Sequence, residues 1–191
     1  MKLSPPRPIR WTRDEYVRLA ELGAFDGRRV ERIRGEVIEM APQDSPHATS
    51  AGLVDDALRR VFRHGHTVRA QQPLALGADS DPEPDVAVVA GTRRDFAPSH
   101  PTSALLVVEV ADSSLAYDRD TKDGLYAEAG IEEYWIVNLV DGVLEVRRRP
   151  QAVAESPGRF RCADRRVLRP GDAIAPLAAP DAAVQVADLL P

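Results

Sequence analysis

The chain has 191 residues, of which 43% are hydrophobic and 29% are charged, and its formal net charge is -5 at pH 7. These proportions are typical of a globular protein and exclude a disordered chain, and no apolar run approaches the roughly 20 residues of a membrane-spanning helix. The N-terminus lacks the apolar stretch of a secretory signal, and the single cysteine, Cys162, excludes an internal disulfide and a cysteine-rich zinc site. We therefore predict a cytoplasmic protein that makes no membrane contact. The acidic charge argues against non-specific coating of nucleic acid, but it allows one local nucleic-acid-binding cleft.

The first predicted element is a helix that begins at Thr12. Thr12 and Glu15 have the spacing of a capping box, and apolar residues then recur at helical intervals. Segments 30–33 and 36–40 alternate around a glycine-containing turn, which predicts a β-hairpin. A second helix is predicted over residues 47–62, whose apolar residues form one stripe.

The middle of the chain predicts the strands of a central sheet. Segment 68–76 has the composition of a strand. Segments 85–90 and 104–111 are short, valine-rich and almost continuously apolar, which is typical of central strands that are covered on both faces.

The following segments predict a helix over 115–129 and a hairpin. Segments 133–139 and 143–146 flank Asp141-Gly142, the strongest short hairpin signal in the chain. The tail beyond Pro150 is rich in proline and alanine, which favours irregular structure.

These elements together predict one domain over residues 1–191 of the α/β (α+β) class. Its core spans about residues 12–150 and contains a mixed central β-sheet flanked by helices, preceded by the N-terminal helix and hairpin. Residues 151–191 are predicted to form an irregular C-terminal extension with edge structure.

Glu109 is the most informative polar residue, because it lies inside an otherwise apolar predicted strand. A buried ionised carboxylate is costly unless it is paired or bound to a metal. Residue types alone leave two roles open for Glu109: a metal ligand, or a carboxylate that a buried arginine or helix N-terminal amides satisfy.

Asp85 begins the preceding strand, directly after Pro82-Glu83-Pro84. A Pro-Asp pair by itself is typical of a turn. Two carboxylates from neighbouring strands, however, form the hard-oxygen site that Mg²⁺ prefers, completed by water and phosphate oxygens. Asp85 and Glu109 are therefore the predicted metal ligands.

The order of these polar residues resembles that of a known family: Glu31, Pro84-Asp85, Glu109-Val110, Lys122 and Tyr126, followed by Glu133-Tyr134-Trp135. This set resembles the Uma-type putative restriction endonucleases, long catalogued as a domain of unknown function within the PD-(D/E)XK nuclease superfamily. The resemblance runs from about Thr12 to the tail. It implies a restriction-endonuclease-like core and Mg²⁺-dependent cleavage of phosphodiester bonds.

The standard superfamily motif has a lysine two residues after the glutamate, where this chain has Ala111. The resemblance implies that Lys122, on the following helix, takes that role, as in members whose lysine has migrated. Helical spacing places Asp118, Lys122 and Tyr126 on one face. An exposed ion pair between Lys122 and Asp118 is the alternative.

Other polar residues have a weaker connection to the site. Glu31 resembles an acidic residue that many such nucleases supply from an N-terminal element, but an ordinary solvent-facing hairpin carboxylate has the same pattern. Glu36 is weaker still. His47 matches a histidine common in the family, although a polar residue at a helix start that contacts local backbone explains it equally. Three residues are expected to have no catalytic part, namely Glu83 as a solvated carboxylate and Tyr126 and Trp135 as core.

The predicted function is that of a Mg²⁺-dependent endonuclease, with Mn²⁺ able to replace Mg²⁺ and with nucleic acid, DNA in the first place, as its partner. Asp85, Glu109, Lys122 and Glu31 are the predicted catalytic residues. Basic side chains at Arg28, Arg29, Arg32 and Arg34 either line the rim of the cleft or balance surface carboxylates. A homodimer fits this activity, because cutting two strands needs two sites.

Two alternatives remain open at the level of sequence. One is a catalytically inactive nuclease-fold protein that binds DNA or regulates another protein, which Ala111 favours. The other is an unrelated α/β protein whose buried Glu109 is merely paired. Convergence of the Asp85 and Glu109 carboxylates on one cavity is the structural observation that distinguishes the predicted metal site from a Glu109 that is merely paired.

Overall fold

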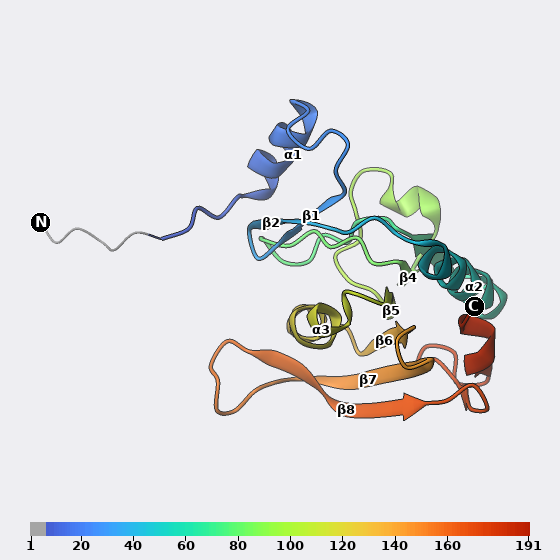
Figure 1. Cartoon of the computed structure of the whole chain (residues 1–191). Coiled ribbons are helices and arrows are strands. Elements are labelled where there is room, and N and C mark those ends of the chain that lie inside the picture. The colour runs from blue at the N-terminus through green and yellow to red at the C-terminus, as the bar shows by residue number, and fades with distance from the viewer. Residues whose placement is uncertain (1–6) are drawn as a thin grey trace, which may run out of the picture.

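A six-stranded β-sheet forms the centre of the molecule in the computed structural model, which describes residues 7–191 (Figure 1). Its strands lie in the same order in space as in the sequence: β3 (His66–Ala70), β4 (Val86–Ala90), β5 (Leu106–Ala111), β6 (Glu133–Asn138), β7 (Val143–Ala152) and β8 (Phe160–Leu168). Strands β5 and β6 are parallel and every other neighbouring pair is antiparallel. The predicted mixed central sheet is thus confirmed.

Helical segments cover both faces of this sheet. On one face α2 (Ser45–Val61) packs with the C-terminal turn η3 (Val186–Leu189) against Val108 and Val110 of β5. On the other face the stretch α3 (Leu115–Tyr117), η2 (Asp118–Lys122) and α4 (Asp123–Glu128) packs against Val107 and Ala111, the alternate residues of the same strand. Strand β5 is therefore buried on both sides, as its continuous apolar sequence predicts.

The helix predicted over 115–129 is confirmed as one helical stretch, but a π-helical turn at Asp118–Lys122 interrupts it. Single π-turns inside α-helices occur often at functional sites, because the wider turn changes the direction of side chains. Lys122 is the last residue of this turn, and Figure 1 shows the stretch beside β5 and β6.

The N-terminal helix α1 (Arg13–Glu21) lies apart from the sheet and buries none of its residues (Figure 1). The predicted capping box is present: the Thr12 side chain accepts from the Glu15 amide, and the Glu15 carboxylate accepts from the Thr12 amide. The hairpin of β1 (Val30–Ile33) and β2 (Glu36–Glu39) is also confirmed. Its two turn residues both have positive φ, as a type I′ turn requires.

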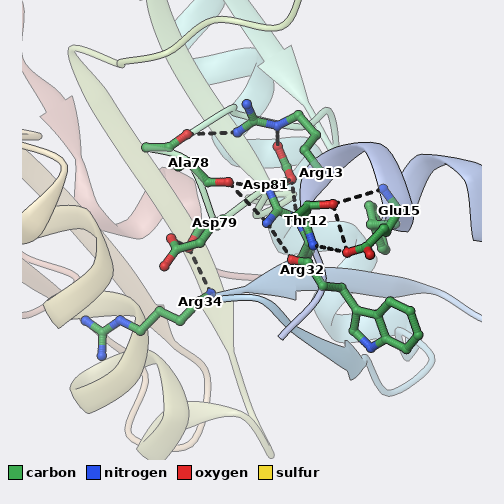
Figure 2. Close-up of polar contacts among 12 residues, drawn as sticks. Thr12, Arg13, Glu15, Arg32, Arg34, Ala78, Asp79 and Asp81 are labelled. Carbon is green, nitrogen blue, oxygen red and sulfur yellow. Dashed lines mark hydrogen bonds and ion pairs between the residues drawn. The ribbon is translucent and has the colours of Figure 1, made fainter. Parts of the chain in front are cut away.

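An ion cluster joins α1 and β1 to the loop before β4 (Figure 2). The Asp81 carboxylate accepts from Arg13 Nε at 2.7 Å and from Arg32 Nε at 2.8 Å. Arg32 is completely buried and also donates to the carbonyl oxygens of Trp11 and Ala78. Because no residue of α1 is fully buried, this cluster is the main polar connection between α1 and the body of the protein.

Two predictions about the fold require correction. The strand predicted over 68–76 ends at Ala70, because Gln71 has a φ of 49° and turns the chain away from the sheet. The C-terminal extension does contain the predicted edge structure, but it is more regular than predicted: β8 is a nine-residue edge strand that pairs with β7, and the short strands β9 (Ala173–Ile174) and β10 (Val184–Gln185) follow it. The short 3₁₀-helical turn η1 (Arg93–Phe96) had no sequence prediction.

Among residues 7–191, the structure contains no helix with the length and apolar character that crossing a membrane requires.

Candidate active site

Asp85 and Glu109 lie at the same end of two neighbouring strands. Asp85 directly precedes β4, and the antiparallel pairing of Val86 with Val108 places Glu109 beside it. The Val110 amide donates to Asp85 Oδ2 at 2.9 Å, and the Asp85 amide donates to Glu109 Oε2 at 3.2 Å. Both carboxylates are buried, and both line one cavity of about 70 Å³. The structure therefore brings together the two acids that the sequence singled out.

Lys122 reaches the same carboxylates from the helical stretch. Its Nζ lies 2.6 Å from Glu31 Oε2 and 3.1 Å from Glu109 Oε1, and the side chain is only 1% exposed. The alternative of an exposed ion pair with Asp118 is wrong, because Lys122 is buried and its carboxylate partners are Glu31 and Glu109. Ala111 has no polar side-chain atom and packs in the core. Lys122, at the end of the π-turn, supplies the amine that Ala111 lacks.

Glu31 is a buried member of the site rather than a solvent-facing hairpin carboxylate. It projects from β1, is 1% exposed, and accepts from the Glu83 amide through Oε1 at 3.1 Å. Glu36, on β2, is exposed and pairs with Arg10, so it lies outside the site. The predicted set of Asp85, Glu109, Lys122 and Glu31 thus forms one cluster in space.

His47 and Gln43 approach Asp85 from the start of α2. His47 Nε2 lies 3.2 Å from Asp85 Oδ1, and Gln43 Nε2 donates to the same oxygen at 3.0 Å. The local capping contact at this helix start is made by Asp44, whose carboxylate accepts from the His47 backbone amide, whereas the His47 side chain faces Asp85. Sequence reasoning missed Gln43, because a glutamine in a loop has no spacing or composition that distinguishes it.

Two residues expected to have no part in the site belong to it. Tyr126 is completely buried, as predicted for a core residue, but its hydroxyl donates to Glu109 Oε1 at 2.6 Å. Glu83 is half-buried and lines the cavity, whereas the sequence predicted a solvated side chain. Trp135 packs in the core as expected and donates its indole N–H to Glu133.

The predicted basic rim is only partly present. Arg29 lines the cavity. Arg32 is wrong as a rim residue, because it is fully buried in the cluster with Asp81. Arg28 faces Glu39 at 3.9 Å, and Arg34 pairs with Glu128 at 3.0 Å. These two therefore balance surface carboxylates.

The cluster carries more negative than positive charge. Burial raises the pKa of the Glu109 carboxyl to about 8; the Lys122 charge opposes that rise, while Asp85, Asp118 and Glu31 add to it. Burial by itself would lower the pKa of Lys122, but Glu109 and Glu31 outweigh it and raise that pKa above its usual range. Lys122 is therefore a fixed cation, and one cation does not neutralise the neighbouring carboxylates.

A divalent cation fits this donor set. The available donors are carboxylate oxygens, which are the ligands that Mg²⁺ prefers, and the excess negative charge favours an added cation. In the described part of the chain, no three His, Cys, Asp or Glu side chains already converge on one metal position. A Mg²⁺ ion commonly has only one or two protein carboxylates as ligands and retains water and phosphate oxygens, so a pair of acids is sufficient.

Asp118 provides a test of these electrostatics that is separate from catalysis. Burial raises the pKa of its carboxyl to about 6, an effect that the hydrogen bond from Ser114 Oγ and the charge of Lys122 reduce. The folded state therefore prefers protonated Asp118, so its contribution to the free energy of unfolding falls as pH rises from about 4 to about 6. We expect Asp118→Asn to be more stable than the wild type by about 1–3 kcal/mol at pH 7.5.

Urea unfolding of both proteins between pH 4 and pH 7.5 measures this difference. The advantage of Asp118→Asn should fall below about 1 kcal/mol near pH 4, where the wild-type carboxyl is protonated in the folded state and only about half ionised in the unfolded state. A difference that does not change with pH would contradict a buried, charged Asp118.

Comparison with known proteins agrees with the resemblance found in the sequence. The chain matches the model of the Uma2 family, described as "Putative restriction endonuclease", over residues 13–186. It is also similar in structure to a putative nuclease belonging to DUF820 from Anabaena variabilis, with a TM-score of 0.69, 15% identity, and coverage of 95% of this chain and 97% of that one. At this identity the likeness shows a common fold. A search of curated proteins gave no match.

Proposed function

Since this chain belongs to the Uma2 family of putative restriction endonucleases, we propose that it is a metal-dependent endonuclease that hydrolyses phosphodiester bonds of nucleic acid, with DNA as its substrate. One observation carries the proposal. The carboxylates of Asp85 and Glu109, from two neighbouring strands, line a single cavity within reach of the buried Lys122 ammonium. Such a set of two acids and a lysine matches the chemistry that the family description names.

In this proposal Asp85 and Glu109 hold Mg²⁺, which Mn²⁺ can replace. The bound ion supplies a Lewis acid for the phosphoryl oxygen and a water of lowered pKa. The Asp85 and Glu109 carboxylates are positioned for this by amide donors from each other's strands, since Val110 holds Asp85 and the Asp85 amide holds Glu109. Rigid positioning of this kind keeps the ligands in place before the substrate arrives.

Lys122 has an electrostatic role rather than that of a base. Its raised pKa keeps it protonated, so it stabilises the negative charge that develops on the reacting phosphate. Glu31 and Tyr126 position the groups around Lys122. Glu31 Oε2 accepts a hydrogen bond from the ammonium, and the Tyr126 hydroxyl donates one to Glu109 Oε1. These contacts hold the Lys122 ammonium against Glu31 and Glu109, whose side chains line the cavity.

A nuclease assay tests the proposal. Linear, circular and single-stranded DNA and duplex RNA are incubated with Mg²⁺, with Mn²⁺ and with a chelator. We expect cleavage within DNA in either metal and none in the chelator. Preference for RNA would correct the substrate, whereas no cleavage of any nucleic acid would favour the catalytically inactive nuclease-fold protein.

Asp85→Asn is the matched variant for this assay, because it preserves the shape of the side chain and removes its charge. We expect it to bind Mn²⁺ at least 10-fold more weakly by calorimetry, since hard cations bind carboxylate far better than amide oxygen. Cleavage should fall below detection. Glu36→Gln, which changes an exposed acid outside the site, should retain both properties. Unchanged Mn²⁺ binding by Asp85→Asn would show that Asp85 is not a ligand.

A further inference from the structure

The end of α2 opposite the active site forms a basic hollow, which we call the α2–β3 groove. It has a volume of about 540 Å³, and its lining combines basic side chains with a few apolar and small ones: Arg59, Phe62, Arg63, His64, Gly65, His66, Thr67, Val68, Thr92 and Arg93. The chain contains no aspartate or glutamate between Asp56 and Asp79. A protein with a net charge of -5 thus concentrates positive charge in one place.

The arginines of this groove differ from most others in the protein because they lack carboxylate partners. Among residues 7–191, the groove residues Arg63 and Arg93 form no ion pair, nor do their sequence neighbours Arg60 and Arg94, and all four are exposed. Elsewhere the typical arginine is paired, as Arg119 is with Glu145 and Arg148 with Glu133. Within the groove only Arg59 is paired, with Asp55 on the preceding turn. Unpaired, exposed guanidinium groups remain available to bind an anion.

The second basic hollow of the molecule, beside β8, serves as a comparison. Its arginines include Arg119, Arg159 and Arg165, which are paired with Glu145, Asp120 and Asp123. Apart from Arg161, the arginines of this hollow would have to exchange their carboxylate partners for an anion. The α2–β3 groove requires no such exchange, so it is the better site for a phosphate.

The groove also lies at a useful distance from the active site. Helix α2 begins next to His47 and ends at Val61, and its 17 residues span roughly 25 Å at 1.5 Å per residue. That length corresponds to roughly 7 nucleotide steps of about 3.4 Å each. In Figure 1 the light-green turn near residue 93 lies next to α2, so Arg93 joins the helix end from a separate element.

The exposed face of α2 between the two places is low. Ala48, Thr49 and Gly52 are exposed there, and a Cβ added to Gly52 would meet no atom within 4 Å. A glycine inside a helix lowers helix stability, and no neighbouring group within this chain requires it. The stretch around Ala48 and Gly52 therefore has room for a nucleic-acid backbone to approach, whereas the exposed Asp56, one turn further along α2, is an acid that the backbone must pass before it reaches the groove.

We propose that the α2–β3 groove binds the phosphate backbone of the nucleic-acid substrate, roughly 7 nucleotides from the scissile phosphate. This proposal rests on the proposed nuclease function and adds the surface that holds the substrate. Phosphate contacts position a protein on its duplex and contribute affinity that depends on salt. The groove thus compensates for an acidic protein whose active-site cavity, within residues 7–191, has Arg29 as its one arginine or lysine.

The test compares two triple variants that change the net charge equally. Arg60→Ala/Arg63→Ala/Arg93→Ala removes the two unpaired arginines of the groove, Arg63 and Arg93, together with the neighbouring unpaired Arg60. Arg18→Ala/Arg161→Ala/Arg169→Ala removes three exposed arginines that also form no ion pair in the described structure, one of them from the hollow beside β8. Binding to a labelled 30-bp DNA duplex is measured by fluorescence anisotropy with Ca²⁺ in place of Mg²⁺ and at several salt concentrations.

We expect the groove variant to bind about 10–100-fold more weakly and to lose roughly 2–3 from the slope of log K against log salt, since each phosphate contact contributes about 0.9. The control variant should lose less than about 3-fold. Cleavage of a duplex with only 4 bp on either side of the cut should be the same for the groove variant and the wild type, because that duplex does not reach the groove.

Equal losses in the two variants, or an unchanged groove variant, would overturn the proposal while leaving the nuclease function intact. A wild type that neither binds nor cleaves nucleic acid would overturn both. Vesicles containing phosphatidylserine form a separate arm: loss of vesicle binding together with unchanged DNA binding would assign the groove to a lipid surface. The same assay with duplex RNA distinguishes the two sources of phosphate backbone.

Discussion

Replacing Lys122 with alanine is expected to lower the rate of metal-dependent DNA cleavage by about 10²–10⁴-fold, the usual contribution of a positioned polar group at a reacting phosphate. The ammonium lies within 3.1 Å of carboxylate oxygens of both Glu31 and Glu109, and it is buried. In the alanine variant, therefore, no cation from solvent occupies the same position. Single-turnover rates at saturating Mg²⁺ and DNA measure the effect on the chemical step.

Metal affinity separates this role from that of the ligands. Lysine is not a ligand, and its removal leaves Glu31 and Glu109 without their cation, so Mn²⁺ binding by Lys122→Ala should be unchanged or tighter. Lys122→Arg preserves the charge, but its larger planar group does not fit a side chain that is 1% exposed, and we expect it to remain slow. Lys122→Met controls for lost volume. Full activity in Lys122→Ala would remove the lysine from the mechanism.

Replacing Asp81 with alanine is expected to destabilise the folded protein by about 3–5 kcal/mol, because it leaves a buried guanidinium without its counter-ion. Arg32 has no exposed surface, and Asp81 is the only carboxylate that it pairs with in residues 7–191. The same carboxylate binds Arg13 at the start of α1, as Figure 2 shows. Urea unfolding monitored by circular dichroism gives the change in the free energy of unfolding.

Glu36→Ala is the matched control, because it breaks the Arg10–Glu36 pair, in which both side chains are about half exposed. Exposed pairs contribute about 0–1 kcal/mol, so this variant should unfold nearly as the wild type does. Adding Arg32→Met to Asp81→Ala should recover part of the lost stability, since it removes the orphaned charge. A loss below about 1 kcal/mol in Asp81→Ala would show that the cluster does not hold the N-terminal region.

The position of Asp81 connects this stability to the active site. Arg32 and Glu31 are consecutive on β1 and therefore point to opposite sides. Arg32 is fixed by Asp81, while Glu31 accepts from the Glu83 amide and from Lys122. The chain from Asp81 to Asp85 is thus attached to β1 at two points before it delivers Asp85 to the cavity. Loss of the ion cluster around Asp81 would therefore disturb the positions of Glu31 and Asp85.

The sequence by itself determined the parts of this protein that depend on local patterns. Short valine-rich runs placed β4 and β5, the Asp-Gly turn placed the β6–β7 hairpin, and the Thr12–Glu15 capping box placed the start of α1. Glu109 was recognisable because one carboxylate in an apolar run is costly to bury. The apolar patterns of these elements, and the free-energy cost of burying a carboxylate within one of them, can both be recognised from a few consecutive residues.

Only the tertiary structure decided which distant residues meet. Strand β3 ends at Ala70, where its partner β4 begins and Gln71 turns the chain away, and β8 pairs along the free edge of β7. Gln43, Tyr126 and the half-buried Glu83 join the site through contacts between elements far apart in the sequence. Arg32, in a cluster of charged residues, had the local sequence pattern of a surface residue. It is buried in the folded protein because the Asp81 carboxylate neutralises its charge. Such pairings lower the free energy only when the chain has already folded, so no local pattern records them.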